Sequence, residues 1–259
     1  MNDVVTGFYD GLASEYHLLF ADWDASVRRQ GEVLDRLIGE MIGAGRQTVL
    51  DASCGIGTQA IGLALRGHEV HGTDLSPAAV ERAGREAARL GASLTTGVAD
   101  LRALETVPGT YDVVLSCDNA VPHLLSDDDL GRAVAGMWSK LRPGGLLVVS
   151  IRDYDALLAA RPRAELPRVF DRPDGRQIAF QVWDWDASAP TYTLHQYIVR
   201  EAVGHDGGWD THHESTVYRA LLRDELGVIV RAAGFGKVAW SLPEQTGYYQ
   251  PILTAQRSP

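Results

Sequence analysis

The stretch that decides the fold is Thr48-Val49-Leu50-Asp51-Ala52-Ser53-Cys54-Gly55-Ile56-Gly57. It begins as a short apolar strand and ends in a loop with two glycines. Residues 58–66 then have the composition of a helix, which Gly67 ends. A strand, a glycine-rich turn and a helix in this order are typical of the first unit of an open parallel sheet, where a ligand approaches the backbone of the turn.

The alternation of strands and helices continues on both sides of this unit. Apolar residues at helical spacing predict a preceding helix over 27–42. The elements expected downstream are strands at 69–72, up to 97–99, at 111–116 and at 146–151, helices over 77–90 and from Ser126 to about Leu141, and a turn over 142–145. Short connections between them predict an α/β fold with a Rossmann-like, doubly wound, mostly parallel sheet.

The residue composition of the sequence changes after Leu166. Residues 178–183 and 191–199 are rich in aromatic and β-branched side chains, which predicts antiparallel strands, with 216–221 as a further one. The elements expected after this insertion are a last helix over 223–233 and strands over 238–242 and 248–254 that complete the main sheet.

Composition excludes several classes of function. The 259 residues carry 24 Lys and Arg against 34 Asp and Glu, a formal net charge of −10, and the pI is near 5.2. Because nucleic acids and anionic membranes attract basic surfaces, we expect neither as a partner. No apolar run reaches the roughly 18 residues of a membrane span, and the N-terminus does not resemble a signal peptide. Two cysteines are too few for a disulfide framework, so we expect a cytoplasmic protein.

The glycine loop and the end of the next predicted strand form a candidate nucleotide site. Gly55 and Gly57 let the backbone approach a ligand at the start of a helix, and Asp74 closes the second strand. A carboxylate there accepts hydrogen bonds from both ribose hydroxyls, which predicts a cofactor that carries a nucleoside. Ala60 completes a Gly-x-Gly-x-x-Ala pattern, which leaves an NAD-dependent oxidoreductase open.

Three features favour S-adenosylmethionine over NAD. Asp51 precedes the glycines and suits the ammonium group of the cofactor's amino-acid end. Asp100, where a third strand would end, suits the adenine amino group. Residues 141–145, Leu-Arg-Pro-Gly-Gly before a strand, are similar to a motif found widely in class I methyltransferases.

The order of these motifs resembles the class I S-adenosylmethionine-dependent methyltransferases. More narrowly, it resembles the group of glycine N-methyltransferases and bacterial glycine/sarcosine N-methyltransferases. The narrower resemblance rests on residues 117–124 (Cys-Asp-Asn-Ala-Val-Pro-His-Leu), 150–155 (Ser-Ile-Arg-Asp-Tyr-Asp) and 8–16 (Phe-Tyr-Asp-Gly-Leu-Ala-Ser-Glu-Tyr). It is strongest from Val49 to Asp155 and faint over the insertion.

The resemblance implies roles for individual residues. The residues implied to contact the cofactor are Ser53, Gly55, Asp74, Asp100, Leu101 and His123, with Tyr16 and Arg29 closing over it. Asp51 and Gly57 of the loop, and Cys117 beside it, complete the predicted cofactor-binding set. The catalytic residues would be Asn119, facing the amine, and Tyr9, near the transferred methyl group. The substrate would be bound by Arg152, through its carboxylate, and by Tyr197, Tyr218 and Tyr249.

Arg152 has two interpretations when the residues are taken alone. Its planar guanidinium can grip a carboxylate with two hydrogen bonds, each worth about 1.5–3 kcal/mol. The alternative is a structural ion pair with Asp118, Asp153 or Asp155. For Asn119, the alternative is a simple turn residue close to Pro122.

The predicted function is N-methylation of a small amine that carries a carboxylate, glycine or sarcosine being the choice that the resemblance implies. N- or O-methylation of a heteroaromatic natural-product intermediate is the nearest alternative. NAD-dependent oxidoreduction and non-catalytic cofactor binding stay open as other classes. His212-His213-Glu214 invites a metal interpretation, but adjacent histidines on a strand point to opposite faces, so no metal site is expected.

The expected organisation is a single domain over 1–259. Its parts are a helical lid segment (1–45), a cofactor-binding core (46–165), an antiparallel insertion that covers the active site (166–221) and a C-terminal helix with strands (222–259). A small molecule is the expected partner, and the resemblance leaves a homo-oligomer open.

Overall fold

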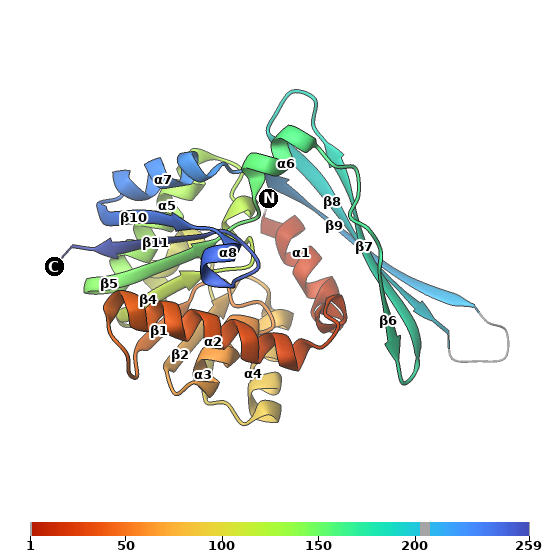
Figure 1. The fold of residues 1–259 in the computed structure, drawn as a ribbon, viewed down its shortest axis with the longest axis horizontal. Coiled ribbons are helices and arrows are strands. Elements are labelled where there is room, and N and C mark those ends of the chain that lie inside the picture. The colour runs from red at the N-terminus through yellow and green to blue at the C-terminus, as the bar shows by residue number, and fades with distance from the viewer. Residues whose placement is uncertain (1, 203–207, 259) are drawn as a thin grey trace.

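The computed structural model of the chain describes residues 2–202 and 208–258. Two sheets organise it, as Figure 1 shows. A seven-stranded sheet has the order β10-β11-β5-β4-β1-β2-β3, and a four-stranded sheet has the order β6-β7-β8-β9. The N-terminal helix α1 (Asn2–Leu12) lies between them.

The central sheet is the predicted mostly parallel one. Its parallel strands are β1 (Thr48–Asp51), β2 (Glu69–Asp74), β3 (Leu94–Val98), β4 (Tyr111–Ser116) and β5 (Leu141–Ser150). Antiparallel β11 (Ile252–Arg257) and β10 (Phe235–Ser241) extend it beyond β5. The predicted last strand over 248–254 was wrong at its start, because residues 248–251 precede β11.

Helices cover both faces of this sheet. The bounds of the covering helices are α2 (Trp23–Ile42), α3 (Thr58–Leu65), α4 (Pro77–Leu90), α5 (Asp127–Lys140) and α7 (Arg223–Ala232). Helices α2, α3 and α4 lie on one face, and α5 and α7 on the other (Figure 1). The predicted N-cap Ser76 accepts a hydrogen bond from Ala79 N, and α4 ends at Gly91, whose φ is 72°.

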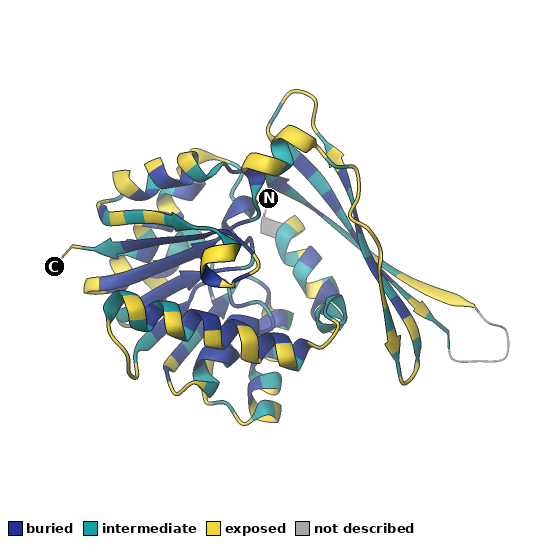
Figure 2. Cartoon of the chain, in the orientation of Figure 1, coloured by how far each residue is buried: buried dark blue, intermediate teal, exposed yellow. Residues whose placement is uncertain are grey.

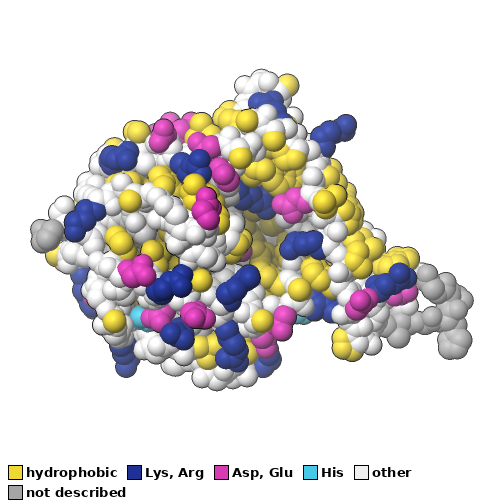
Figure 3. Space-filling view, in the orientation of Figure 1, with side chains coloured by type: hydrophobic (Ala, Val, Ile, Leu, Met, Phe, Trp, Pro, Cys, Tyr) yellow, Lys and Arg dark blue, Asp and Glu magenta, His cyan; other side chains and the backbone are white. Residues whose placement is uncertain are grey.

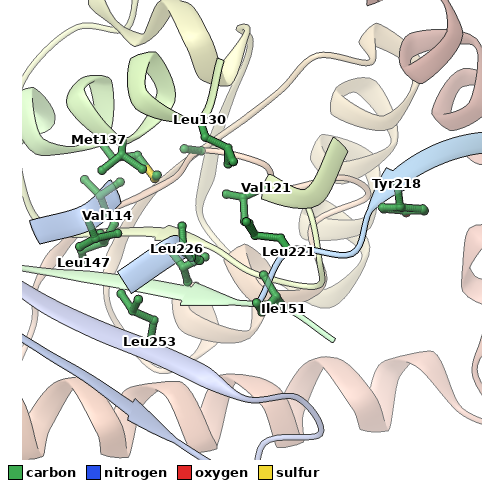
Figure 4. Close-up of a cluster of buried hydrophobic side chains, with 14 of the residues drawn as sticks. Val114, Val121, Leu130, Met137, Leu147, Ile151, Tyr218, Leu221, Leu226 and Leu253 are labelled. Carbon is green, nitrogen blue, oxygen red and sulfur yellow. The ribbon is translucent and has the colours of Figure 1, made fainter. Parts of the chain in front are cut away.

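Strand β5 shows why both faces must be covered. Its side chains alternate, so that Leu146 and Val148 join one buried cluster while Leu147 and Val149 join another. All four are fully buried. Figure 4 shows part of the second cluster, where Leu147 lies with Met137 of α5 and Leu226 of α7. In Figure 2 the strands of the central sheet are accordingly mostly buried.

Several other local features were predicted wrongly or missed. The predicted turn over 142–145 lies inside β5, where the pairing jumps from Tyr111 with Leu141 to Val113 with Leu146. Between these two pairs, the four residues 142–145 lie opposite Asp112 alone, so the turn is a bulge in the strand, and Gly144 takes a φ of 80° within it. Helix α6 (Tyr154–Ala160) and strand β6 (Arg168–Arg172) had no predicted counterpart.

The antiparallel sheet is the predicted insertion, with one strand more than expected. Its long strands are β7 (Gly175–Trp185), β8 (Thr191–Glu201) and β9 (Trp209–Arg219). Strand β9 begins earlier than the predicted 216–221. Along β8 buried and partly buried residues alternate, which defines an inner face toward α1 and an outer face. Figure 3 shows the molecule hollowed between the two sheets, with hydrophobic side chains gathered along the antiparallel one.

Among the described residues, no helix has both the length and the apolar character that crossing a membrane requires.

Candidate active site

The site is built at the carboxyl ends of β1, β2 and β4, where parallel strands leave a crevice. At the end of β2, the Asp74 carboxylate accepts hydrogen bonds from Gly55 N at 2.8 Å and Ser76 N at 2.9 Å. Gly55 has a φ of 52°, and a Cβ added to it would meet no atom within 4 Å. The backbone of Gly55 is therefore open to a ligand, while Asp74 fixes the loop.

Gly57 has a different role from Gly55. A Cβ at Gly57 would come within 2.8 Å of Ile61 Cδ1 and 3.3 Å of Ala83 Cβ. Its φ of 93° also belongs to the left-handed region. Gly57 thus allows α3 to begin and α4 to pack closely, and the structure does not place it among the residues that line the site.

Two adjoining cavities lie over this crevice, with empty volumes of about 650 and 520 Å3 that include their open mouths. They share Tyr9, Ser53, Asp74 and Ala120. The first cavity also contains Asp100, Leu101 and His123, and the second contains Tyr16, Gly55 and Cys117. The structure therefore brings together eight predicted cofactor residues. They come from the strand ends, the loops that follow them and the 3-10 turns Tyr16–Leu19, Leu101–Thr106 and Val121–His123.

Arg29 is not brought to this site. It is an exposed residue of α2, and it borders a separate small cavity with Tyr248 and Tyr249. On α2, Gln30 faces inward instead and is buried. The helical period therefore points Arg29 outward, and the structure does not bring it to the two cavities over the crevice.

Asp51 lies beneath the glycine loop. Its Oδ1 accepts a hydrogen bond from Ser53 N at 3.3 Å, while its buried Oδ2 has no partner among the described residues. Burial raises the pKa of Asp51 to about 8. An acceptor of this kind beside an open loop suits a donor that a ligand supplies.

Tyr9 and His123 connect α1 to the rest of the site. The Tyr9 hydroxyl lies 2.9 Å from His123 Nε2 and 3.4 Å from the Tyr218 hydroxyl. The His123 ring packs on Tyr218, with centroids 4.0 Å apart. Burial lowers the pKa of His123 to about 3, which keeps its imidazole neutral at pH 7.

Arg152 follows β5 and reaches the inner face of the antiparallel sheet. Its guanidinium donates hydrogen bonds to the Tyr192 hydroxyl and to Gln181 Oε1, both at 3.1 Å. It also lies over the rings of Trp183 and Tyr218, at 4.9 and 5.6 Å from their centroids.

Arg152 makes no ion pair within the described part of the chain. Two of the three predicted carboxylate partners, Asp153 and Asp155, pair with Arg223 instead, at 3.2 and 3.1 Å. Asp118, the third predicted partner, forms no ion pair with Arg152. A cation held by neutral groups, with its acidic neighbours otherwise engaged, can accept an anionic ligand.

Asp118 and Asn119 stand at the end of β4 in an unusual backbone conformation. Their φ values are 58° and 67°, consecutive left-handed values that few residues other than glycine adopt. Asn119 Oδ1 accepts a hydrogen bond from Arg152 N at 3.0 Å, and its buried Nδ2 has no partner among the described residues. The Tyr16 hydroxyl donates to Asp118 Oδ2 at 3.1 Å.

The three predicted substrate tyrosines have separate positions. Tyr218 lies on the inner face, beside Arg152 and His123. Tyr249 lies in the loop before β11, where the charge of Asp118 acts on it. Tyr197 is not brought to the site. It packs on Phe180 and His213 on the outer face of the antiparallel sheet, because it is the next residue after the inner-face Gln196.

Sequence reasoning missed several residues of the site. Asp118 was considered only as an ion-pair partner, and Gln181 and Tyr192 were not considered. The period of two along β7 and β8 places Gln181, Trp183 and Tyr192 on one face and could have identified them. His212 and His213 do point to opposite faces, His212 toward Glu15 and His213 toward His195.

Comparisons with known proteins agree with this geometry. A family described as a methyltransferase domain matches residues 49–145. A tRNA 5-carboxymethoxyuridine methyltransferase of Escherichia coli (strain K12) is 31% identical, covering 74% of this chain and 76% of its own. The chain belongs to the S-adenosylmethionine-dependent methyltransferases.

Two further comparisons describe this methyltransferase. A glycine/sarcosine N-methyltransferase of Parasynechococcus marenigrum (strain WH8102) is 34% identical over 53% of this chain, which spans about half (48%) of that relative's length. The structure of CalS10, an amino pentose methyltransferase from Micromonospora echinaspora, shares the fold with a TM-score of 0.71 and 21% identity, covering 90% of this chain and 92% of that one.

S-adenosylmethionine is the cofactor of the family, and the residues present fit it. Asp74 stands between the two cavities, where a ribose would require a carboxylate. The unpartnered Oδ2 of Asp51 suits an ammonium group, and Asp100 borders the first cavity while also binding Arg102. Because the chain belongs to this family, the NAD-dependent oxidoreductase that the sequence had left open is excluded.

Proposed function

We propose that this methyltransferase transfers a methyl group to the nitrogen of a small amine that carries a carboxylate, such as glycine or sarcosine. The observation that carries the proposal is Arg152, a partly buried guanidinium without a carboxylate partner among the described residues. An uncompensated charge away from water is unfavourable, so a ligand carboxylate is the expected counter-ion. The glycine/sarcosine N-methyltransferase relative supports this choice.

The surroundings of Arg152 favour a compact acceptor over a large planar one. Trp183 stacks on Tyr192 with centroids 4.9 Å apart, Trp185 lies 4.8 Å from the same ring, and Tyr192 lies 5.6 Å from Tyr218. These rings fill the inner face by packing on one another. A heteroaromatic acceptor would have to separate them, which costs their mutual contacts.

The net charge of −10 argues against a tRNA acceptor, which one of the relatives methylates according to its name. Neutralising nucleic-acid phosphates requires a surface rich in Lys and Arg, and binding weakens without it. The acidic balance therefore favours a small acceptor over a tRNA.

The chain's contribution to the reaction is positioning and electrostatics. When bound, S-adenosylmethionine supplies an electrophilic methyl group on a sulfonium. Asp74 and the Gly55 backbone would hold its nucleoside, while Arg152 would orient the acceptor by its carboxylate. Aligning two reactants in this way lowers a barrier by about 7–11 kcal/mol in favourable cases. The Tyr9 hydroxyl, held by His123, would contribute an oxygen near the developing positive charge.

An acceptor screen tests the proposal. Purified protein is incubated with methyl-labelled S-adenosylmethionine and with glycine, sarcosine, or a set of planar heterocyclic amines and phenols. Labelled N-methylglycine or N,N-dimethylglycine is the expected product. Turnover of a planar heterocycle with no small amino acid methylated would contradict the proposal in favour of the natural-product alternative.

A further inference from the structure

The hydrogen bonds of Asn119 in the structure indicate that another residue binds the amine of the acceptor. Asn119 was expected to face the amine, whose N–H groups would need its amide oxygen as acceptor, but this oxygen accepts a hydrogen bond from Arg152 N. The part of Asn119 without a partner in the described chain is Nδ2, a donor. A donor suits an oxygen of the acceptor's carboxylate, so the amine requires a different partner.

Asp118 has the position and the chemistry for that role. It lines the second cavity together with Tyr9 and Tyr16. Its carboxylate accepts a hydrogen bond from the hydroxyl of Tyr16 at 3.1 Å, and no ion pair to it occurs among the described residues. A carboxylate has about four acceptor positions, so one hydroxyl leaves room for an amine.

We propose that Asp118 binds the amine of the acceptor and takes its proton, at the opposite end of the acceptor from Arg152. This inference rests on the proposed function and deepens it. A carboxylate for the amine and a guanidinium for the carboxylate together recognise a zwitterion, and the consecutive residues Asp118 and Asn119 would serve its two ends.

Other polar groups are less suited to accept the proton. The neutral ring of His123 is a weak base because burial lowers its pKa to about 3. Burial raises the pKa of Tyr9 well above its usual value, so its hydroxyl stays protonated. Burial also raises the pKa of the Asp118 carboxyl, which strengthens it as a base.

Asp118 borders the second cavity and also reaches the acceptor side. Its charge acts on Tyr218 and is opposed by that of Arg152, and both of these residues lie around the proposed acceptor. Asp51, with its unpartnered oxygen beneath the glycine loop, is available for the cofactor's ammonium group.

The proposed reaction consists of a proton transfer followed by a methyl transfer. The acceptor enters as an ammonium and gives one proton to Asp118, which leaves a neutral amine. The nitrogen lone pair forms the N–C bond to the methyl group as the C–S bond breaks, and that electron pair stays on sulfur. The product leaves as a methylated ammonium, and Asp118 releases its proton to solvent.

The test compares binding of glycine, acetate and methylamine to the protein saturated with S-adenosylhomocysteine, by titration calorimetry. Asp118→Asn is the variant, since asparagine has the same shape and tolerates a positive φ. We expect glycine and methylamine to bind about tenfold more weakly or worse, while the affinities for acetate and S-adenosylhomocysteine change less than twofold. Asp153→Asn, which changes a partly exposed carboxylate nearby, is the matched control and should change none of them.

The proton transfer has a readout of its own. In Asp118→Asn, kcat/KM should rise with pH up to the pKa of the free amine, whereas the unmodified protein reaches its plateau at lower pH. The titratable and charged groups that face Asp118 are Tyr9, Tyr16, Cys117, Arg152, Tyr218, Tyr248 and Tyr249. Of these, Arg152 stays charged and the others stay protonated through neutral pH.

Each contrary outcome has a distinct meaning. Unchanged glycine and methylamine affinities, equal weakening of acetate binding, or an unchanged pH profile would overturn the role of Asp118. Weaker S-adenosylhomocysteine binding would assign Asp118 to the cofactor's ammonium instead. If the unmodified protein binds methylamine but neither glycine nor acetate, the proposed function fails while the Asp118 inference is still tested on methylamine. If it binds no amine, both fail.

Discussion

Asp74 Oδ2 accepts a hydrogen bond from Gly55 N at 2.8 Å, which joins the end of β2 to the glycine loop after β1. The two residues are 19 positions apart in the sequence. They are adjacent in space because the parallel neighbours β1 and β2 end at the same edge of the sheet. The same carboxylate borders both cavities, so it is placed to organise the loop and to meet a ligand.

Asp74→Ala should therefore weaken cofactor binding. Charged hydrogen bonds contribute about 1.5–3 kcal/mol each, so the affinity for S-adenosylhomocysteine is expected to fall by about one to two orders of magnitude. Titration calorimetry measures this change. Asp128→Ala removes an exposed carboxylate of α5 and serves as the control. An unchanged affinity in Asp74→Ala would contradict a nucleoside site at the end of β2.

Arg152→Ala should separate acceptor binding from cofactor binding. Loss of the guanidinium removes the charged hydrogen bonds to a carboxylate, so the KM of glycine or sarcosine should rise about tenfold or more. S-adenosylhomocysteine affinity should change less than twofold. Arg176→Ala removes an exposed arginine of the antiparallel sheet that pairs with Glu201, and it serves as the control. Equal losses of acceptor and cofactor affinity would refute the role given to Arg152.

Gly57→Ala should destabilise the fold more than Gly91→Ala. Both glycines have left-handed backbones, with φ of 93° and 72°, so each alanine costs about 1 kcal/mol from conformation alone. Only at Gly57 would the new Cβ also crowd Ile61 and Ala83. This crowding adds about 1–3 kcal/mol, measured as the free energy of unfolding in urea. Equal losses at both positions would show that Gly57 is constrained by its backbone alone.

His123 should make stability fall in acid. Its pKa is lowered to about 3 in the folded chain from about 6.5 when unfolded, so below pH 6.5 the unfolded chain binds a proton that the folded chain does not. The folded state then loses up to about 1.4 kcal/mol per pH unit as the pH falls from 6.5 toward 3. Asp51, whose pKa is raised to about 8, acts in the opposite direction between about pH 4 and 8.

His123→Gln separates the effect of His123 on the pH dependence of stability from that of Asp51. Urea unfolding at several values between pH 7.5 and pH 5 should show a smaller loss of stability in the variant than in the unmodified protein. Parallel curves for the two proteins would mean that His123 is not held neutral by burial.

The arrangement of strands and helices could be predicted because each element is encoded locally. Ser76 and Pro77 begin α4 and Gly91 ends it through bonds within a few residues, and the apolar run at 111–116 has the length of a buried strand. The bulge in β5 could not be predicted in the same way. Its glycines have the composition of a turn, and only pairing with β4 draws them into the sheet.

The sequence by itself determined which edge of the sheet carries the candidate site, since the glycine loop, Asp74, Asn119 and Arg152 all come shortly after the ends of predicted strands. Only the tertiary structure decided which atoms of these residues remain available. Asn119 turns its oxygen to Arg152 N, Asp153 and Asp155 bind Arg223, and Tyr197 faces outward while Tyr192 meets the guanidinium. The physical reason is that hydrogen bonds between distant segments, and the exact register of an antiparallel strand, depend on packing that no local pattern specifies.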